Sequence, residues 1–255
     1  MTGLKDLWKD NCLRNPKPIV SSRILILNPV RSASLDQLSR DFFRAKASPG
    51  FEVECEILPD GPASVESPYD EAIAAAPVAR RIASAADQGF SAAVINCFLH
   101  PGLQAAREVA AIPVVGAGES AIRMALAVGQ RFSIIDVGPV KYASRSPPRQ
   151  VRSMGIAARF ASIRGIGVPV LELNERPDFT IKRIVREAKL AAVEDGADVI
   201  ILGCTGLAGL AERIKLGIPI VDPALSALRT SETLILLGLT PGRRPQLRFR
   251  GDPRH

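Results

Sequence analysis

The feature that most constrains this chain is an internal repeat that carries one cysteine in each copy. An apolar run leads into Cys97, and a second apolar run leads into Cys204. At nearly the same distance after each cysteine comes an Ile-Pro-aliphatic-Val segment, and Ser-Ala-aliphatic-Arg follows at equal spacing in both copies. These segments begin at Ile112 and Ser120 in the first copy and at Ile218 and Ser226 in the second. We interpret the chain as two similar halves, each of which brings one cysteine to the end of a strand.

Short apolar runs alternate with helical segments along both halves. We expect strands at residues 23–27, 51–58, 93–97, 113–115, 131–137, 168–173, 199–203 and 219–221. We expect helices from residue 32 onward and at 71–88, 102–109, 119–128, 150–160, 180–194 and 224–237. Such alternation is typical of parallel sheets with helices on both faces. The predicted fold class is therefore α/β, with two similar lobes, each a parallel sheet flanked by helices. We expect a pseudo-two-fold axis to relate the lobes and the active site to lie in the cleft between them.

Domain boundaries follow from the repeat and from local composition. Residues 1–22 contain two prolines and show no sustained period, so we expect an N-terminal arm. The first lobe is expected to comprise residues 23–117 together with 223–240, and the second lobe residues 118–222. Residues 241–255 hold five arginines and one aspartate, and they form the predicted basic C-terminal tail.

The formal net charge of +7 is concentrated in that tail, which weakens a nucleic-acid interpretation. No basic stripe interleaved with aromatic residues is recognisable, so we expect neither a nucleic acid nor a membrane as a partner. Hydrophobic residues make up 47% of the chain and charged residues 23%, as in soluble globular proteins. The sequence has no apolar stretch of membrane-spanning length and no secretory signal, so a cytoplasmic location is predicted. We expect a small-molecule substrate and a homo-oligomeric protein.

The chain has four cysteines and only two histidines. In a reducing cytoplasm the cysteines are expected to be thiols. No Cys-x-x-Cys pair occurs, so we predict no metal site. Cys12 lies in an irregular segment and Cys55 in a strand-like run of alternating charges, and both are expected to be structural or incidental. Cys97 and Cys204 are therefore the candidates for chemistry.

A single cysteine at a strand end is usually a small buried hydrophobic residue. Two cysteines at equivalent positions of a repeat could instead flank one ligand from opposite sides. A helix is expected after each cysteine, and its N-terminal partial charge would lower the pKa of the thiol. One thiolate and one thiol form a base and an acid. Such a pair suits removal of a proton from one face of a carbon and its return to the other face.

Removal of a proton beside a carbonyl group requires donors that stabilise the resulting enolate. No lysine motif for pyridoxal phosphate and no metal cluster is recognisable, so no cofactor is predicted. The candidate donors are the backbone N–H groups after each cysteine, the Thr205 hydroxyl and the Asn28 amide. Thr205 and Asn28 have structural alternatives as a helix N-cap and a turn former. His100 is expected to face solvent at the start of a helix rather than to act as a base.

Four groups of residues carry a family resemblance: Cys97-Phe98-x-x-Pro101-Gly102-Leu103, Pro113-Val114-Val115-Gly116-x-Gly118-Glu119, Ala161-Ser162-Ile163-Arg164 followed by Pro169-Val170-Leu171, and Leu202-Gly203-Cys204-x-Gly206. In order and spacing they resemble the hydantoin racemase branch of the aspartate/glutamate (Asp/Glu) racemase superfamily, over residues 23–237. The resemblance implies cofactor-independent racemisation or epimerisation, with Cys97 and Cys204 as the acid–base pair in a cleft between two α/β lobes. It places Asn28, Phe98, Glu119, Thr205 and Gly206 near the substrate. Ser32, Gly116 and Ser120, in or beside the same motifs, complete the candidate substrate-binding residues.

Two loops depart from the usual family pattern. Val30 and Arg31 follow Asn28-Pro29 where the family usually has an asparagine next, and Arg31 could select an anionic or larger substrate or point to solvent. Leu99 and His100 stand where the family often has Gly-Asp. We expect a racemase of 5-substituted hydantoins or of a related cyclic ureide such as allantoin. The alternatives are an amino-acid racemase of the aspartate/glutamate type, a small-diacid isomerase or decarboxylase, and a non-catalytic ligand-binding relative.

Overall fold

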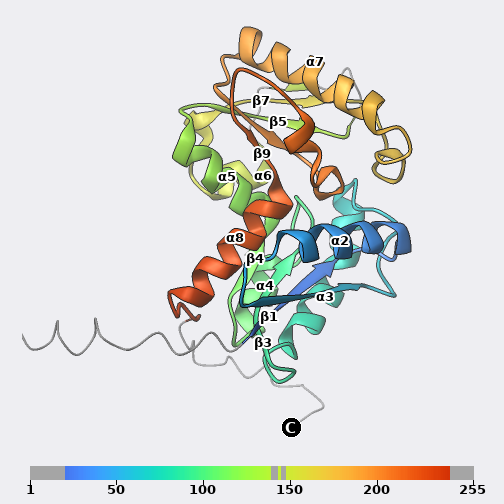
Figure 1. The fold of residues 1–255 in the computed structure, drawn as a ribbon, viewed down its shortest axis with the longest axis vertical. Helices are drawn as coiled ribbons and strands as arrows, with labels where there is room; N and C mark the ends of the chain where they lie inside the picture. The colour runs from blue at the N-terminus through green and yellow to red at the C-terminus, as the bar shows by residue number, and fades with distance from the viewer. Residues whose placement is uncertain (1–20, 139–142, 145–147, 242–255) are drawn as a thin grey trace, which may run out of the picture.

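The computed structural model describes residues 21–138, 143–144 and 148–241. The described chain forms two α/β lobes, each built on its own sheet (Figure 1). This confirms the predicted fold class. The predicted N-terminal arm and most of the predicted tail lie outside the described residues. Among the described residues, no helix is long and apolar enough to cross a membrane.

The first lobe is a parallel sheet of strand order β2-β1-β3-β4. Its strands are β1 (Ser22–Asn28), β2 (Phe51–Ile57), β3 (Phe90–Ile95) and β4 (Val114–Gly116). Its helices are α2 (Ala33–Lys46), α3 (Pro68–Ala83), α4 (Leu103–Val109) and α8 (Pro223–Leu236). Side chains alternate across a strand, so Leu25 and Leu27 of β1 pack against α3 and α4. Ile24 and Ile26 face the opposite way and pack against α2 and α8.

The second lobe repeats this arrangement, with strand order β6-β7-β5-β8-β9. Its strands are β5 (Phe132–Asp136), β6 (Ala143–Ser144), β7 (Phe160–Gly165), β8 (Val199–Leu202) and β9 (Ile220–Val221). Its helices are α5 (Ala117–Val128), α6 (Arg149–Ser153) and α7 (Pro177–Asp195). The order β7-β5-β8-β9 matches β2-β1-β3-β4 strand for strand, as expected for an internal duplication. The sheet is not wholly parallel, because the edge strand β6 runs antiparallel to β7.

Two predicted elements of the second lobe are wrong. The strand expected at 168–173 is a short 3-10 helix, η2 (Val170–Glu172), and the helix expected at 150–160 ends at Ser153. The strand that pairs with β5 is β7. The polar residues Ser162 and Arg164 interrupt the apolar run of β7, so the sequence did not mark it as a strand. In the structure, Ser162 donates a hydrogen bond to Asp195 at 2.6 Å, and Arg164 pairs with the same carboxylate. Long-range partners on α7 therefore allow polar residues inside a buried strand.

Local capping explains where several helices begin and end. The Ser32 hydroxyl accepts a hydrogen bond from the Leu35 N–H at the start of α2. The Asp222 carboxylate caps α8 in the same way, and Gly196 ends α7 with a φ of 72°. Helix α8 packs against the first-lobe sheet through Leu228 and its neighbours, although it follows the second lobe in sequence. The predicted domain boundaries place it in the same lobe.

Candidate active site

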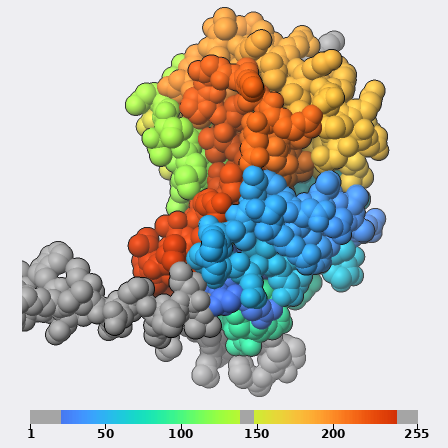
Figure 2. Space-filling view, viewed as in Figure 1, coloured from blue at the N-terminus to red at the C-terminus, as the bar shows by residue number. Residues whose placement is uncertain are grey.

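A cavity of about 310 Å³ lies where the two lobes meet, and residues of both lobes line it. Figure 2 shows the blue atoms of the first lobe in contact with the orange atoms of the second. The walls are formed by the loops after strands β1, β3, β5 and β8 and by parts of α2 and α6. The carboxyl ends of parallel strands are where ligands bind in α/β folds. The cavity is therefore the candidate active site.

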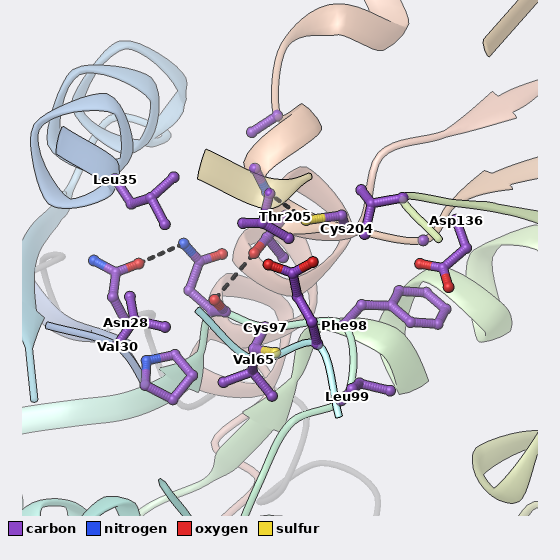
Figure 3. Close-up of a pocket in the computed structure, with 18 of the residues that line it drawn as sticks. Asn28, Val30, Leu35, Val65, Cys97, Phe98, Leu99, Asp136, Cys204 and Thr205 are labelled. Atoms are coloured by element: carbon purple, nitrogen blue, oxygen red, sulfur yellow. Dashed lines mark hydrogen bonds between the residues drawn. The ribbon is translucent and has the colours of Figure 1, made fainter. Parts of the chain in front are cut away.

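Cys97 and Cys204 both line this cavity, one from each lobe (Figure 3). Strand β3 ends at Ile95 and strand β8 ends at Leu202, so each cysteine lies two residues beyond its strand. Strand β3 is third in the order β2-β1-β3-β4, and strand β8 is third in the matching order β7-β5-β8-β9. The duplication therefore brings equivalent strand ends, and with them two thiols, to one cavity.

Burial dominates the acidity of both thiols. It raises the pKa of Cys97 to about 11 and that of Cys204 to about 12, and the Asp136 carboxylate adds to both shifts. Backbone N–H groups of Leu99 and His100 lower the Cys97 pKa, and the Gly206 N–H, 3.3 Å from the Cys204 sulfur, lowers the Cys204 pKa. The expected net lowering of a thiol pKa by a following helix is wrong. Helix α4 begins only at Leu103, and Cys204 is followed by a single 3-10 turn.

A hydrogen-bond chain joins Asn28 to the second lobe. The Asn28 amide donates to Asp36 at 3.3 Å, and its oxygen accepts from the Asn96 amide at 2.8 Å. The Thr205 hydroxyl donates to the Asn96 carbonyl oxygen at 3.0 Å and so links the two lobes. Asn28 and Thr205 line the cavity, but the hydroxyl proton of Thr205 is already used in this link. That leaves Thr205 a structural role besides any contact with substrate.

The other predicted binding residues divide into two groups. Phe98 and Gly206 line the cavity. Ser32, Gly116, Glu119 and Ser120 are not among its lining residues. Ser32 caps α2 instead, and the Glu119 carboxylate pairs with Arg107 at 2.8 Å. A direct contact of these four residues with substrate remains a prediction.

His100 does not face solvent as expected. Its Nδ1 is buried and has no hydrogen-bond partner among the described residues, and burial lowers the pKa of the imidazole to about 4. The ring lies so close to Gly116 that a Cβ there would approach it at 2.9 Å. His100 has a left-handed backbone, with a φ of 39°, and is not among the cavity-lining residues. It therefore serves as a packing residue behind the Cys97 loop.

Comparison with known proteins agrees with this geometry. The Asp/Glu/hydantoin racemase family matches residues 24–230. The chain belongs to this family. It is 34% identical over 220 residues to the hydantoin racemase of Rhizobium meliloti, covering 84% of this chain and 89% of that relative.

Solved structures of the same kind match the fold closely. The allantoin racemase from Klebsiella pneumoniae superposes with a TM-score of 0.80 at 34% identity, covering 91% of this chain and 95% of that chain. The allantoin racemase from Pseudomonas fluorescens gives a TM-score of 0.78 at 34% identity, with 88% and 95% covered. The chain is thus a racemase-family enzyme, an isomerase homologous to hydantoin and allantoin racemases.

The charged side chains among the described residues that line this racemase cavity are both acidic. Asp136 ends β5, and burial together with the nearby Glu66 carboxylate raises its pKa. Neither residue was among the sequence candidates. Asp136 stands at the carboxyl end of a strand beside β8, just as Asn28 stands at the carboxyl end of β1. Glu66 lies in a loop, where no periodic pattern marks it.

Further lining residues also escaped the sequence-based prediction. Gln150 and Asn174 come from segments whose structure differs from the predicted strand and helix. Asn96 directly precedes Cys97, but a strand-end asparagine is also a common turn former. Val30 is a wall residue, whereas Arg31 is exposed and does not line the cavity. Of the two interpretations of Arg31, the solvent-facing one fits the structure.

Proposed function

We propose that this racemase-family enzyme racemises 5-substituted hydantoins or a related cyclic ureide such as allantoin, without a cofactor, through Cys97 and Cys204. The observation that carries the proposal is the placement of the two thiols at equivalent strand ends of two lobes, on one cavity. The hydantoin and allantoin racemases at 34% identity support the substrate class.

The reaction moves one proton from one face of a carbon to the other. One cysteine, as thiolate, takes the proton from the stereogenic carbon, and the electron pair moves onto the adjacent carbonyl oxygen as an enolate. The second cysteine, as thiol, gives its proton to the opposite face while the enolate returns its electrons to that carbon. The two cysteines have then exchanged protonation states, so the enzyme is ready for the reverse turnover. Burial raises the pKa of both thiols, to about 11 for Cys97 and about 12 for Cys204.

Residues of the cavity wall can stabilise both the thiolate and the enolate in this reaction. The Gly206 N–H donates to the Cys204 sulfur at 3.3 Å and so favours its thiolate. The Gln150 side chain is buried on the cavity wall, and its amide nitrogen lies 3.4 Å from the Phe98 carbonyl oxygen. That contact is long, so the amide N–H groups of Gln150 are donors for a developing enolate.

The charge of the cavity favours a neutral ring substrate over an amino acid or a diacid. Its described lining residues include Glu66 and Asp136 but no lysine, arginine or histidine. A substrate carboxylate would face these carboxylates without a cationic partner, which is unfavourable in a partly buried site. A hydantoin or allantoin ring is uncharged and presents N–H and carbonyl groups instead.

Deuterium exchange tests the proposal directly. One enantiomer of a hydantoin or of allantoin, incubated with the enzyme in D₂O, should lose optical rotation and gain deuterium at the stereogenic carbon. Cys97→Ser and Cys204→Ser should each abolish the loss of optical rotation, because a serine hydroxyl is too weak an acid to replace either thiol. Cys55→Ser is the matched control, since Cys55 is buried in the first lobe away from the cavity. Racemisation that survives either cavity substitution would refute the two-thiol mechanism.

A further inference from the structure

The cavity continues past the two cysteines toward an acidic end. In Figure 3, Asn28, Val30 and Leu35 lie on one side of the cysteines and Asp136 lies on the other. A ring held between the thiols can therefore direct its substituent toward either side. The side that contains Asp136 is chemically distinct, because it holds a charge.

The Asp136 carboxylate stands at the edge of an apolar cluster. Residues at alternate positions of a strand share a face, so Asp136 lies on the same face of β5 as Phe132 and Ile134. Those two residues pack in one buried cluster with Phe98, whose ring also lines the cavity. No described residue forms an ion pair with Asp136. A carboxylate and an aromatic ring on one wall are the two groups that bind an ammonium or guanidinium ion.

A second carboxylate strengthens the negative potential of this cavity. Glu66 comes from the first lobe and lines the same space, and the Ser64 hydroxyl donates to its Oε1 at 2.7 Å. No described cationic side chain pairs with Glu66 either. Two carboxylates from opposite lobes repel each other unless a cation lies near both.

Asn96, beside Cys97 on the wall, holds a further hydrogen-bond acceptor. Arg40 holds the Asp36 carboxylate at 2.7 Å, and Asp36 accepts from the Asn28 amide, so the Asn28 oxygen must face Asn96. The Asn96 amide nitrogen is thereby committed to the Asn28 oxygen and to Ser39. Its Oδ1 is left without a partner among the described residues, on a residue only 7% exposed. This unpaired acceptor adds to the negative potential beside the cavity.

We infer that this racemase selects 5-substituted hydantoins whose substituent ends in an ammonium or guanidinium group, which pairs with the Asp136 carboxylate within reach of the Phe98 ring. Glu66 makes the electrostatic potential of the cavity more negative and need not contact the substituent itself. The inference rests on the proposed function, because it concerns the substituent of the same ring. It also states what the cavity rejects, namely substituents that end in a carboxylate.

The test compares hydantoins whose substituents end in different groups. The kcat/KM for a hydantoin with an aminobutyl substituent is measured against that for a pentyl substituent of equal length, and a carboxyethyl substituent is the anionic arm. Wild type should favour aminobutyl over pentyl by about tenfold or more, and carboxyethyl should be the poorest of the three. Asp136→Asn should reduce the aminobutyl-to-pentyl ratio by about tenfold to a hundredfold.

The ratio of the two kcat/KM values reports on the substituent alone, because the proton transfer at the ring is the same for both substrates. Asp136 also raises the pKa of both thiols, but that effect is common to all the hydantoins and cancels between two substrates. Asp41→Asn is the matched control, because Asp41 is exposed on α2 and outside the cavity. It should leave the ratio unchanged. If Asp136→Asn does not fold, Glu66→Gln supplies the second variant and should lower the ratio by about threefold through the lost potential.

Each outcome decides one question. A wild-type ratio near one, or a ratio that neither Asp136→Asn nor Glu66→Gln lowers, overturns the inference and leaves the proposed function standing. Deuterium exchange with none of the hydantoins and none with allantoin overturns the proposed function and this inference with it.

Discussion

The two cavity thiols show how burial and hydrogen bonding oppose each other at a single residue. Backbone N–H groups point toward both sulfurs, which favours thiolate, yet removal from solvent raises both pKa values well above the usual value for cysteine. The Asp136 carboxylate acts in the same direction as burial. Thiolate is therefore a minor species at neutral pH, and the enzyme must work from that small fraction or stabilise it when substrate binds.

Alkylation should reveal these raised pKa values. In the Cys204→Ser and Cys97→Ser variants, the remaining cavity thiol should react with iodoacetamide at a rate that rises about tenfold per pH unit between pH 7 and 10. The sign follows from the raised pKa: the thiolate fraction grows with pH until the pKa of about 11 for Cys97 or about 12 for Cys204 is reached. Asp136→Asn should shift both curves to lower pH. A rate that levels off near pH 7 would contradict the structure.

At the scale of elements, the start of α5 supports the loop that carries Cys97. Gly118 in the first turn of α5 lies so close to this loop that a Cβ there would meet the Phe98 carbonyl oxygen at 2.1 Å and the His100 Nδ1 at 3.2 Å. A side chain cannot fit without displacing the loop backbone. The glycine therefore allows a helix of the second lobe to approach the cysteine loop of the first.

Gly118→Ala should consequently damage both stability and activity. The inserted methyl group should lower the free energy of unfolding by about 1–3 kcal/mol, measured by urea titration, because it overpacks a buried contact. Displacement of Phe98 should also reduce kcat/KM for hydantoin racemisation. Gly217→Ala is the control, since no atom lies within 4 Å of a Cβ at that position. Equal behaviour of the two variants would show that the close approach is unimportant.

At the scale of the whole molecule, the site exists only while the two lobes keep their relative position. Cys97 belongs to the first lobe and Cys204 to the second. The hydrogen bond from the Thr205 hydroxyl to the Asn96 carbonyl oxygen crosses between the lobes next to both cysteines. A small shift at this point would change the distance between base and acid, and proton transfer is sensitive to such a change.

Thr205→Val should test this link, because valine keeps the shape of threonine and removes the hydroxyl. We expect kcat/KM to fall about tenfold while the unfolding midpoint changes little, since one hydrogen bond is worth about 1 kcal/mol. Thr205→Ser keeps the hydroxyl and should retain most activity. Loss of activity in Thr205→Ser to the same degree would assign the effect to the methyl group instead.

The sequence by itself determined the fold class, the duplication and the strand-end positions of Cys97 and Cys204. These depend on local periodicity and on repeated motifs, which a single chain displays directly. The strand at β7 was misplaced because its one arginine and one serine are compatible with burial only through Asp195 on a distant helix.

Only the tertiary structure decided the character of the site. In the folded chain Arg31 points to solvent, the Nδ1 of His100 is buried, the pKa of both thiols is raised, and Glu66 and Asp136 line one cavity. Each of these outcomes depends on which groups from distant segments surround a side chain and on how much water they exclude. The burial of a side chain and the electrostatic potential around it depend on all the groups that surround it, and no local pattern of residues contains that information.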